Sequence, residues 1–123
     1  MSKFFTNPDA APIGAEILEQ FFDDSTDPEC LGQIAWGNED NFDVELPNKP
    51  SSGNFYDITV VECSGGEGDG ADTTVIFAFE CNSKLVTYFS IEGTYSSWGD
   101  NRWGNKITFV KPRQVEITIY EAI

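Results

Sequence analysis

The feature that most constrains the fold is a change in hydrophobic period close to Gly53. Before it, five apolar residues recur at i, i+4, i+5, i+8 and i+9, the spacing of one face of a helix. After it, apolar and polar residues alternate in short runs, as they do in strands with one buried face. The sequence therefore predicts helices first and a sheet second. The helical positions are Ile13, Ile17, Leu18, Phe21 and Phe22.

The predicted helical region covers residues 13–37. Pro12 suits the first position of a helix, and Asp27 could cap a second, shorter helix that begins at Pro28 and closes at Gly37. We expect Leu31, Ile34 and Ala35 to form its apolar side. Residues 1–12 read as an irregular arm because Pro8 and Pro12 interrupt regular structure.

Five segments of the second half have the composition of strands. The segment 73–81 is apolar on both faces, which is typical of a central strand with cover on each side, and 114–121 shows the clearest alternation. Residues 38–53 read as a polar loop that could hold a short strand at 42–46, and Pro47 and Pro50 exclude a central position in the sheet for it. The five segments are 55–63, 73–81, 85–95, 107–110 and 114–121.

Short connections between such segments favour an antiparallel meander. A chain of 123 residues forms one domain. We therefore predict an α+β fold, in which one or two N-terminal helices pack on a four- to five-stranded antiparallel sheet spanning residues 54–121.

Negative charge is concentrated near the N-terminus. The chain carries 21 acidic and seven basic residues, a net charge of −14. Residues 1–46 hold eleven acids and only Lys3 as a base, a net of −10, whereas residues 47–123 hold ten acids and six bases, a net of −4. Such a field repels nucleic acid and anionic membranes and attracts basic protein surfaces. Solubility, or a salt-rich habitat, is the alternative explanation.

The sequence contains no recognisable catalytic or metal site. Histidine is absent, and Cys30, Cys63 and Cys81 have no zinc spacing. We interpret these cysteines as reduced, small apolar residues of a cytosolic protein. Adjacent acids such as Asp23 and Asp24 are expected by chance in so acidic a chain. We therefore expect no enzyme, no catalytic residue, no metal and no cofactor.

Two loops stand out. Ser64–Asp72, SGGEGDGAD, joins two predicted strands; Ala71 and Ala78 occupy positions where a calcium loop needs oxygen ligands, and no lysine serves a phosphate. It is either a plain acidic loop or part of a binding edge. SSWGDNRWGN places Trp98 and Trp103 around Arg102; the tryptophans could anchor a partner, stack on a sugar, or fold back over the open end of the sheet.

These motifs resemble small acidic bacteriophage proteins with the pattern GGEGxG, SWxGxxW, VxP and VTxYE. The resemblance covers residues 62–121, and it departs from the pattern at Gly99 and Asp100. That family has no agreed activity, so the resemblance implies only a phage origin and localisation in the host cytoplasm. The matching residues are Gly65, Gly66, Glu67, Gly68, Gly70, Trp98, Trp103, Val110, Pro112, Val115, Tyr120 and Glu121.

Charge and resemblance together predict an inhibitor that occupies a basic surface of a host nucleic-acid-handling or defence enzyme, of anti-CRISPR or anti-restriction type, as a DNA mimic would. No direct binding of nucleic acid or membrane is expected, and a homodimer is left open. The alternatives are a virion structural or accessory protein acting through homotypic contacts, and a carbohydrate-binding module. The expected partner-binding residues are Asp23, Asp24, Asp27, Glu29, Glu39, Asp40, Asp43, Glu45, Glu67, Asp69, Asp72, Trp98, Arg102 and Trp103.

Overall fold

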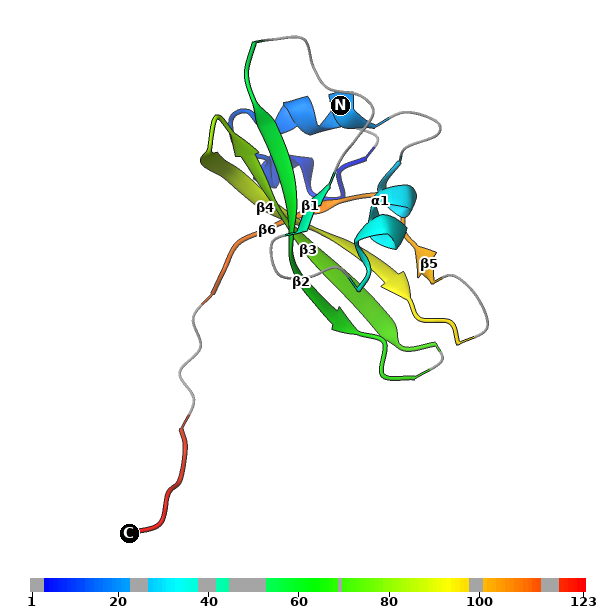
Figure 1. The fold of residues 1–123 in the computed structure, drawn as a ribbon, viewed down its shortest axis with the longest axis vertical. Helices are drawn as coiled ribbons and strands as arrows, with labels where there is room; N and C mark the ends of the chain where they lie inside the picture. Colours follow the sequence, from blue (N-terminus) through cyan, green and yellow to red (C-terminus); the bar gives the residue numbers. More distant parts are fainter. Residues whose placement is uncertain are drawn as a thin grey trace.

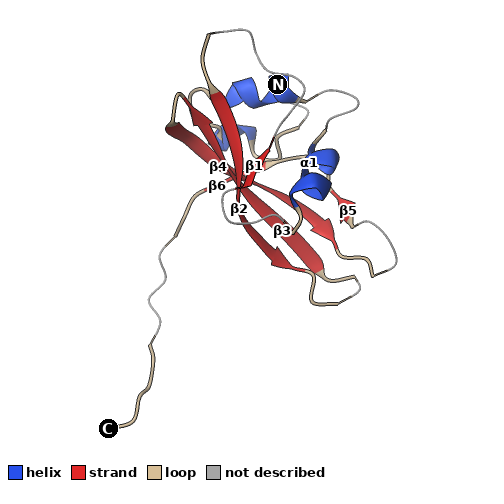
Figure 2. Ribbon diagram, viewed as in Figure 1, coloured by secondary structure: helices blue, strands red, loops and turns tan. Residues whose placement is uncertain are grey.

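The computed structural model describes residues 4–22, 27–37, 42–44, 53–68, 70–97, 101–113 and 118–123, with the backbone alone for 42–44. Within these residues the chain has the predicted α+β fold, with the helices in its N-terminal third (Figure 1). Figure 2 shows the helices gathered on one side of the sheet. The prediction of helices packed on an antiparallel sheet is therefore confirmed.

Three long strands form the body of the sheet. They follow one another as antiparallel hairpins, so β3 lies between β2 and β4 as its composition predicted. The β3–β4 turn places Asn82 and Ser83 at φ 51° and 67°, the left-handed geometry that suits the twist of a tight hairpin. These strands are β2 (Tyr56–Gly65), β3 (Asp72–Cys81) and β4 (Lys84–Thr94).

Three short strands complete the sheet, which has six strands among the described residues. The predicted edge strand is present as β1 (Phe42–Val44), which pairs with β2. Strands β5 (Arg102–Trp103) and β6 (Thr108–Val110) both pair with β4, at its C-terminal end and its middle respectively. These short strands bring the number of strands to six, above the four or five that were expected.

The second predicted helix is α1 (Pro28–Ala35). Asp27 caps it as predicted, because its Oδ1 accepts a hydrogen bond of 3.0 Å from the Cys30 backbone N–H. Leu31 and Ala35 are fully buried, whereas Ile34 is 47% exposed. The apolar side of α1 is therefore narrower than the sequence suggested.

The first predicted helix is a 3-10 helix, Ala15–Phe21 (η2), which starts later than Pro12 because Gly14 precedes it at φ 94°. Leu18 and Phe21 are buried as predicted. Ile13 lies outside the helix and is fully exposed, so its assignment to the apolar face was wrong.

The N-terminal arm is more ordered than predicted. It contains a 3-10 helix, Pro8–Ala10 (η1), and Phe5 forms a parallel bridge with Ile107. The Asn7 side chain accepts from the Phe109 N–H at 2.9 Å and donates to its carbonyl at 3.0 Å. These bonds fix the arm beside β6.

The last predicted strand, 114–121, is not formed in its described part, residues 118–121. Residues 114–117 lie outside the described residues, and 118–123 have no strand partner and extend away from the body (Figure 1). Alternation gives a segment the capacity for strand structure, but a strand also needs a neighbour to satisfy its backbone N–H and C=O groups.

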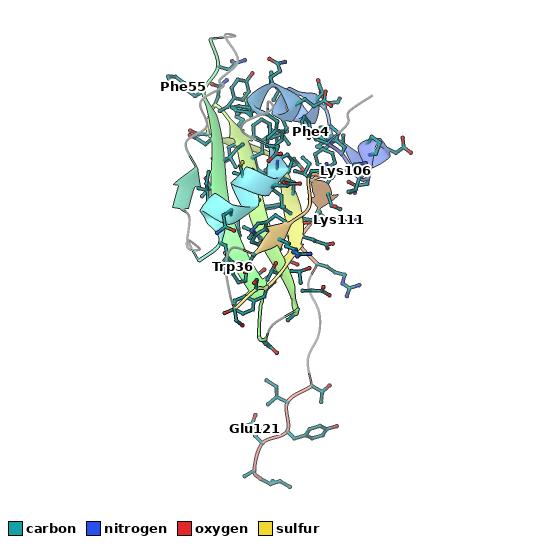
Figure 3. All side chains as sticks on the ribbon, turned by 90° about the vertical axis from the view of Figure 1, so that its right-hand side faces the viewer. Phe4, Trp36, Phe55, Lys106, Lys111 and Glu121 are labelled. Carbon is teal, nitrogen blue, oxygen red and sulfur yellow. The ribbon has the colours of Figure 1, made fainter. Side chains whose placement is uncertain are left out.

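The core lies between the helices and one face of β2, β3 and β4. Phe77, Phe79 and Phe89 are fully buried there, and Phe77 stacks on Phe89 with ring centroids 4.9 Å apart. Leu18 and Leu31 close this core from the helix side. We call this the inner face of the sheet. Figure 3 shows the side chains that fill the space between helices and strands.

Candidate protein-binding surface

The other face of the sheet, the outer face, carries three carboxylates, two of them at one end of the sheet and the third nearer its middle. Alternation along β3 places Phe77 inward and Thr74 outward, and the register pairs Thr74 with Glu92 and Ile76 with Glu62. Asp72, Glu62 and Glu92 are all exposed. We call these three residues the acidic triad.

The acidic triad is spaced by the sheet itself. Neighbouring strands lie roughly 4.8 Å apart and residues i and i+2 are roughly 6.7 Å apart, so Asp72 and Glu92 are separated by roughly 8 Å at the backbone. Within the described part of the chain, no ion pair or hydrogen bond involves the carboxylate of any of the three. Their charge is therefore presented to solvent from three neighbouring strands of the sheet.

The loop Ser64–Asp72 lies beside this end of the sheet and is held in place. Its backbone exchanges two hydrogen bonds with Tyr95, from Gly70 N–H at 3.0 Å and to the Ala71 carbonyl at 2.9 Å. Gly65 has φ 86°, and a Cβ there would overlap the Asp72 carbonyl. The glycines thus serve the turn, and Glu67 is exposed beside it. Asp69 lies outside the described residues.

Trp103 is not an exposed anchor. Its side chain is only 9% exposed and lies between Gly32 of α1 and Gly93 of β4. A Cβ at Gly32 would come within 2.7 Å of the indole. The Trp103 Nε1–H donates to the Gln33 Oε1 at 3.0 Å, and its ring centroid is 5.7 Å from that of Trp36. Trp103 therefore follows the alternative prediction, in which a tryptophan folds back onto the sheet.

Arg102 is exposed between two clefts. One, of about 590 Å³, runs past Asp72, Thr74 and Glu92; the other, of about 440 Å³, runs past Glu29. Both include Arg102 and the buried Trp103. Arg102 thus lines both clefts, together with Glu29 of α1 in one and with Asp72 of β3 and Glu92 of β4 in the other.

The structure brings together only part of the predicted residue set. Glu29 on α1, Glu67, Asp72 and Arg102 gather at this end, while Asp27 is engaged as the helix cap. The side chain of Asp43 is not described. The remaining predicted residues lie outside the described residues: Asp23, Asp24, Glu39, Asp40, Glu45, Asp69 and Trp98.

Sequence reasoning missed Glu62, Glu92 and Trp36. Strand parity could have found Glu92, which alternates with the buried Phe89 and Ile91, but it would have placed Glu62 inward with Ile58 and Val60, and only the irregularity in β2 between Val60 and Glu62 turns Glu62 to the outer face. Trp36 follows α1 and contacts both Trp103 and the position of Gly66. No local sequence pattern predicts these contacts, because Trp103 and Gly66 lie far from Trp36 in the sequence.

Other features of the described residues bear on function. No disulfide joins Cys30, Cys63 and Cys81. Within the described ranges, no three His, Cys, Asp or Glu side chains lie close enough together to hold a metal ion. None of the helices in those ranges has the length and apolar character needed to span a membrane. Comparisons with family models, with curated proteins and with solved structures find no match for this chain.

Proposed function

We propose that this chain is an acidic binding protein, encoded by a phage, that blocks a host nucleic-acid-handling or defence enzyme by occupying its basic surface. The observation that carries the proposal is the acidic triad, whose exposed carboxylates project from three adjacent strands of the sheet. The resemblance to small acidic phage proteins supplies the host context.

The electrostatics favour such a partner over nucleic acid or an anionic membrane. A net charge of −14 steers the protein toward Lys- and Arg-rich grooves and speeds the encounter. Carboxylates held by a sheet need little reorganisation on binding, which lowers the entropic cost of association. Arg102 breaks the run of negative charge, so the surface can also distinguish one orientation of a basic partner from another.

A carbohydrate-binding module is less well supported. That function needs two exposed indoles to stack on sugar rings, and Trp103 is buried against Gly32 and Gly93. Homotypic contact, in contrast, gains support from the exposed C-terminal segment.

The first test measures binding to a purified host nuclease or CRISPR effector by calorimetry between 50 and 500 mM NaCl. We expect affinity to fall as salt rises, because screening weakens contacts between opposite charges. A DNA duplex should compete with the chain for the same enzyme. An affinity that does not respond to salt, or simultaneous binding of DNA, contradicts the proposal.

A matched pair of variants localises the contact. Glu62→Gln, Asp72→Asn and Glu92→Gln together remove three charges from the acidic triad. Asp9→Asn, Glu16→Gln and Asp57→Asn remove three exposed charges elsewhere. We expect the first variant to lose at least about tenfold in affinity and the second to lose much less. Removing charges that contact the partner lowers the affinity more than removing charges that only attract it from a distance. Equal losses would show that only net charge matters.

A further inference from the structure

The C-terminal segment, residues 118–123, carries large apolar side chains in contact with solvent. Ile119 is 80% exposed and Tyr120 is 92% exposed. Figure 3 shows the segment well away from the body of the molecule. In sequence, Val115, Ile117 and Ile119 alternate with polar residues, the pattern of a strand that buries one face. Apolar side chains presented together in this way mark an interaction site.

An apolar groove lies at the edge of β4, between the N-terminal arm and β6. Its volume is about 520 Å³. Pro12 forms one side, Leu85 and Val86 of β4 form the floor, and Val110 and Pro112 form the other side. Leu85 is 50% exposed. We call this the β4 groove.

The sheet edge beside the β4 groove is incomplete. β6 pairs with β4 only from Tyr88 to Ser90, and no described strand continues this pairing toward Lys84. Continuation of the register would set Pro112 opposite Val86, where proline has no N–H to donate. The chain's own continuation is therefore a poor strand for this position.

We propose that the C-terminal segment of a second copy of this chain adds as a strand to this edge of β4 and places its apolar side chains in the β4 groove. Each copy has both the segment and the groove, so reciprocal exchange closes a two-fold dimer. Backbone hydrogen bonds satisfy the open edge, and the alternating side chains set the register.

Charge complementarity supports a copy of this chain as the occupant. The chain is strongly acidic, yet exposed Lys84, Lys111 and Arg113 border the β4 groove or follow it directly. The incoming segment carries Glu121, and Glu116 precedes it in the sequence. The chain's own segment 118–123 extends away from the body of the molecule (Figure 1), and Pro112 already forms part of the groove wall.

Sedimentation equilibrium of the full chain tests the proposal. We expect a dimer that persists at 500 mM NaCl, because apolar and backbone contacts hold it. Ile119→Asp and Leu85→Asp should each raise the dimer dissociation constant at least tenfold, while Ile34→Asp, an exposed site on α1, should not. Circular dichroism establishes that each variant is folded.

Mixing the two disruptive variants gives the decisive result. Ile119→Asp retains an intact groove and Leu85→Asp retains an intact segment, so an equimolar mixture should recover association through one good contact. A monomeric full chain overturns the proposal, whether its segment folds back on its own groove or stays extended. A dimer unaffected by Ile119→Asp also overturns it. None of these variants alters the acidic triad, so failure here leaves the proposed function standing.

Discussion

The two faces of the sheet are built from the same strands but differ in how deeply their side chains are buried. On β3, Phe77 is fully buried against Phe89, while its neighbours on the outer face, Thr74 and Ile76, are partly exposed. The difference comes from the helices, which cover only one side (Figure 2). Strand parity sorts the side chains into two sets, and the position of the helices decides which set becomes core.

The comparison also separates two uses of aromatic residues. On the inner face, Trp103 is held between two glycines, so its size stabilises the join of α1 and β4. The outer face and the C-terminal segment carry the groups available for contact, which are the acidic triad, Leu85 and Tyr120. The residues that stabilise the fold and those of the two proposed contact surfaces thus lie on different parts of the molecule.

The largest expected effect tests the contrast between the faces directly. Phe77→Ala removes a fully buried ring and should lower the free energy of unfolding by about 3–5 kcal/mol. Ile76→Ala, one position along on the outer face, should cost about 1–2 kcal/mol because part of its side chain is already in water. Urea unfolding measures both. Equal costs would mean that the outer face is also covered.

An intermediate effect sharpens the role assigned to Trp103. Alanine in place of glycine usually stabilises a helix by about 1 kcal/mol. At Gly32 the added Cβ would meet the indole at 2.7 Å, so Gly32→Ala should instead lower the unfolding free energy by about 1–3 kcal/mol.

Gly68→Ala is the matched control for this substitution. A Cβ at Gly68 meets nothing within 4 Å, so its effect on unfolding should stay within about 0.5 kcal/mol. Stabilisation by Gly32→Ala would show that helix α1 is not packed on Trp103 in solution.

The smallest expected effect concerns the outer face. Glu92→Gln changes an exposed, unpaired side chain and should alter the free energy of unfolding by no more than about 0.5 kcal/mol. Thermal or urea unfolding at low salt checks this. A clear stabilisation would reveal repulsion within the acidic triad, whereas a clear loss would place Glu92 in a structural contact.

Much of the fold could be predicted because its signals are local. The Asp27 cap, the turn at Asn82 and the central position of β3 each depend on a few adjacent residues. Ile13 was wrongly assigned to the helix because its spacing from Ile17 fits a helical face. The positive φ of Gly14, which lies between them, makes the helix begin only at Ala15.

The candidate site was less predictable. Glu29, Glu67, Asp72 and Arg102 were anticipated from charge and loop composition, but their gathering at one end depends on how α1 meets the strands. Glu62 and Glu92 were missed because their common face follows from strand register, which no single segment encodes.

By itself, the sequence determined the N-terminal helical region, the three long strands and how negative the molecule is. These properties follow from spacing, composition and backbone preference, which act over a few residues. Only the tertiary structure decided that Trp103 is core and that the acidic triad shares a face. Those outcomes depend on contacts between residues far apart in the chain, because burial is a property of what packs on a side chain and not of the side chain alone.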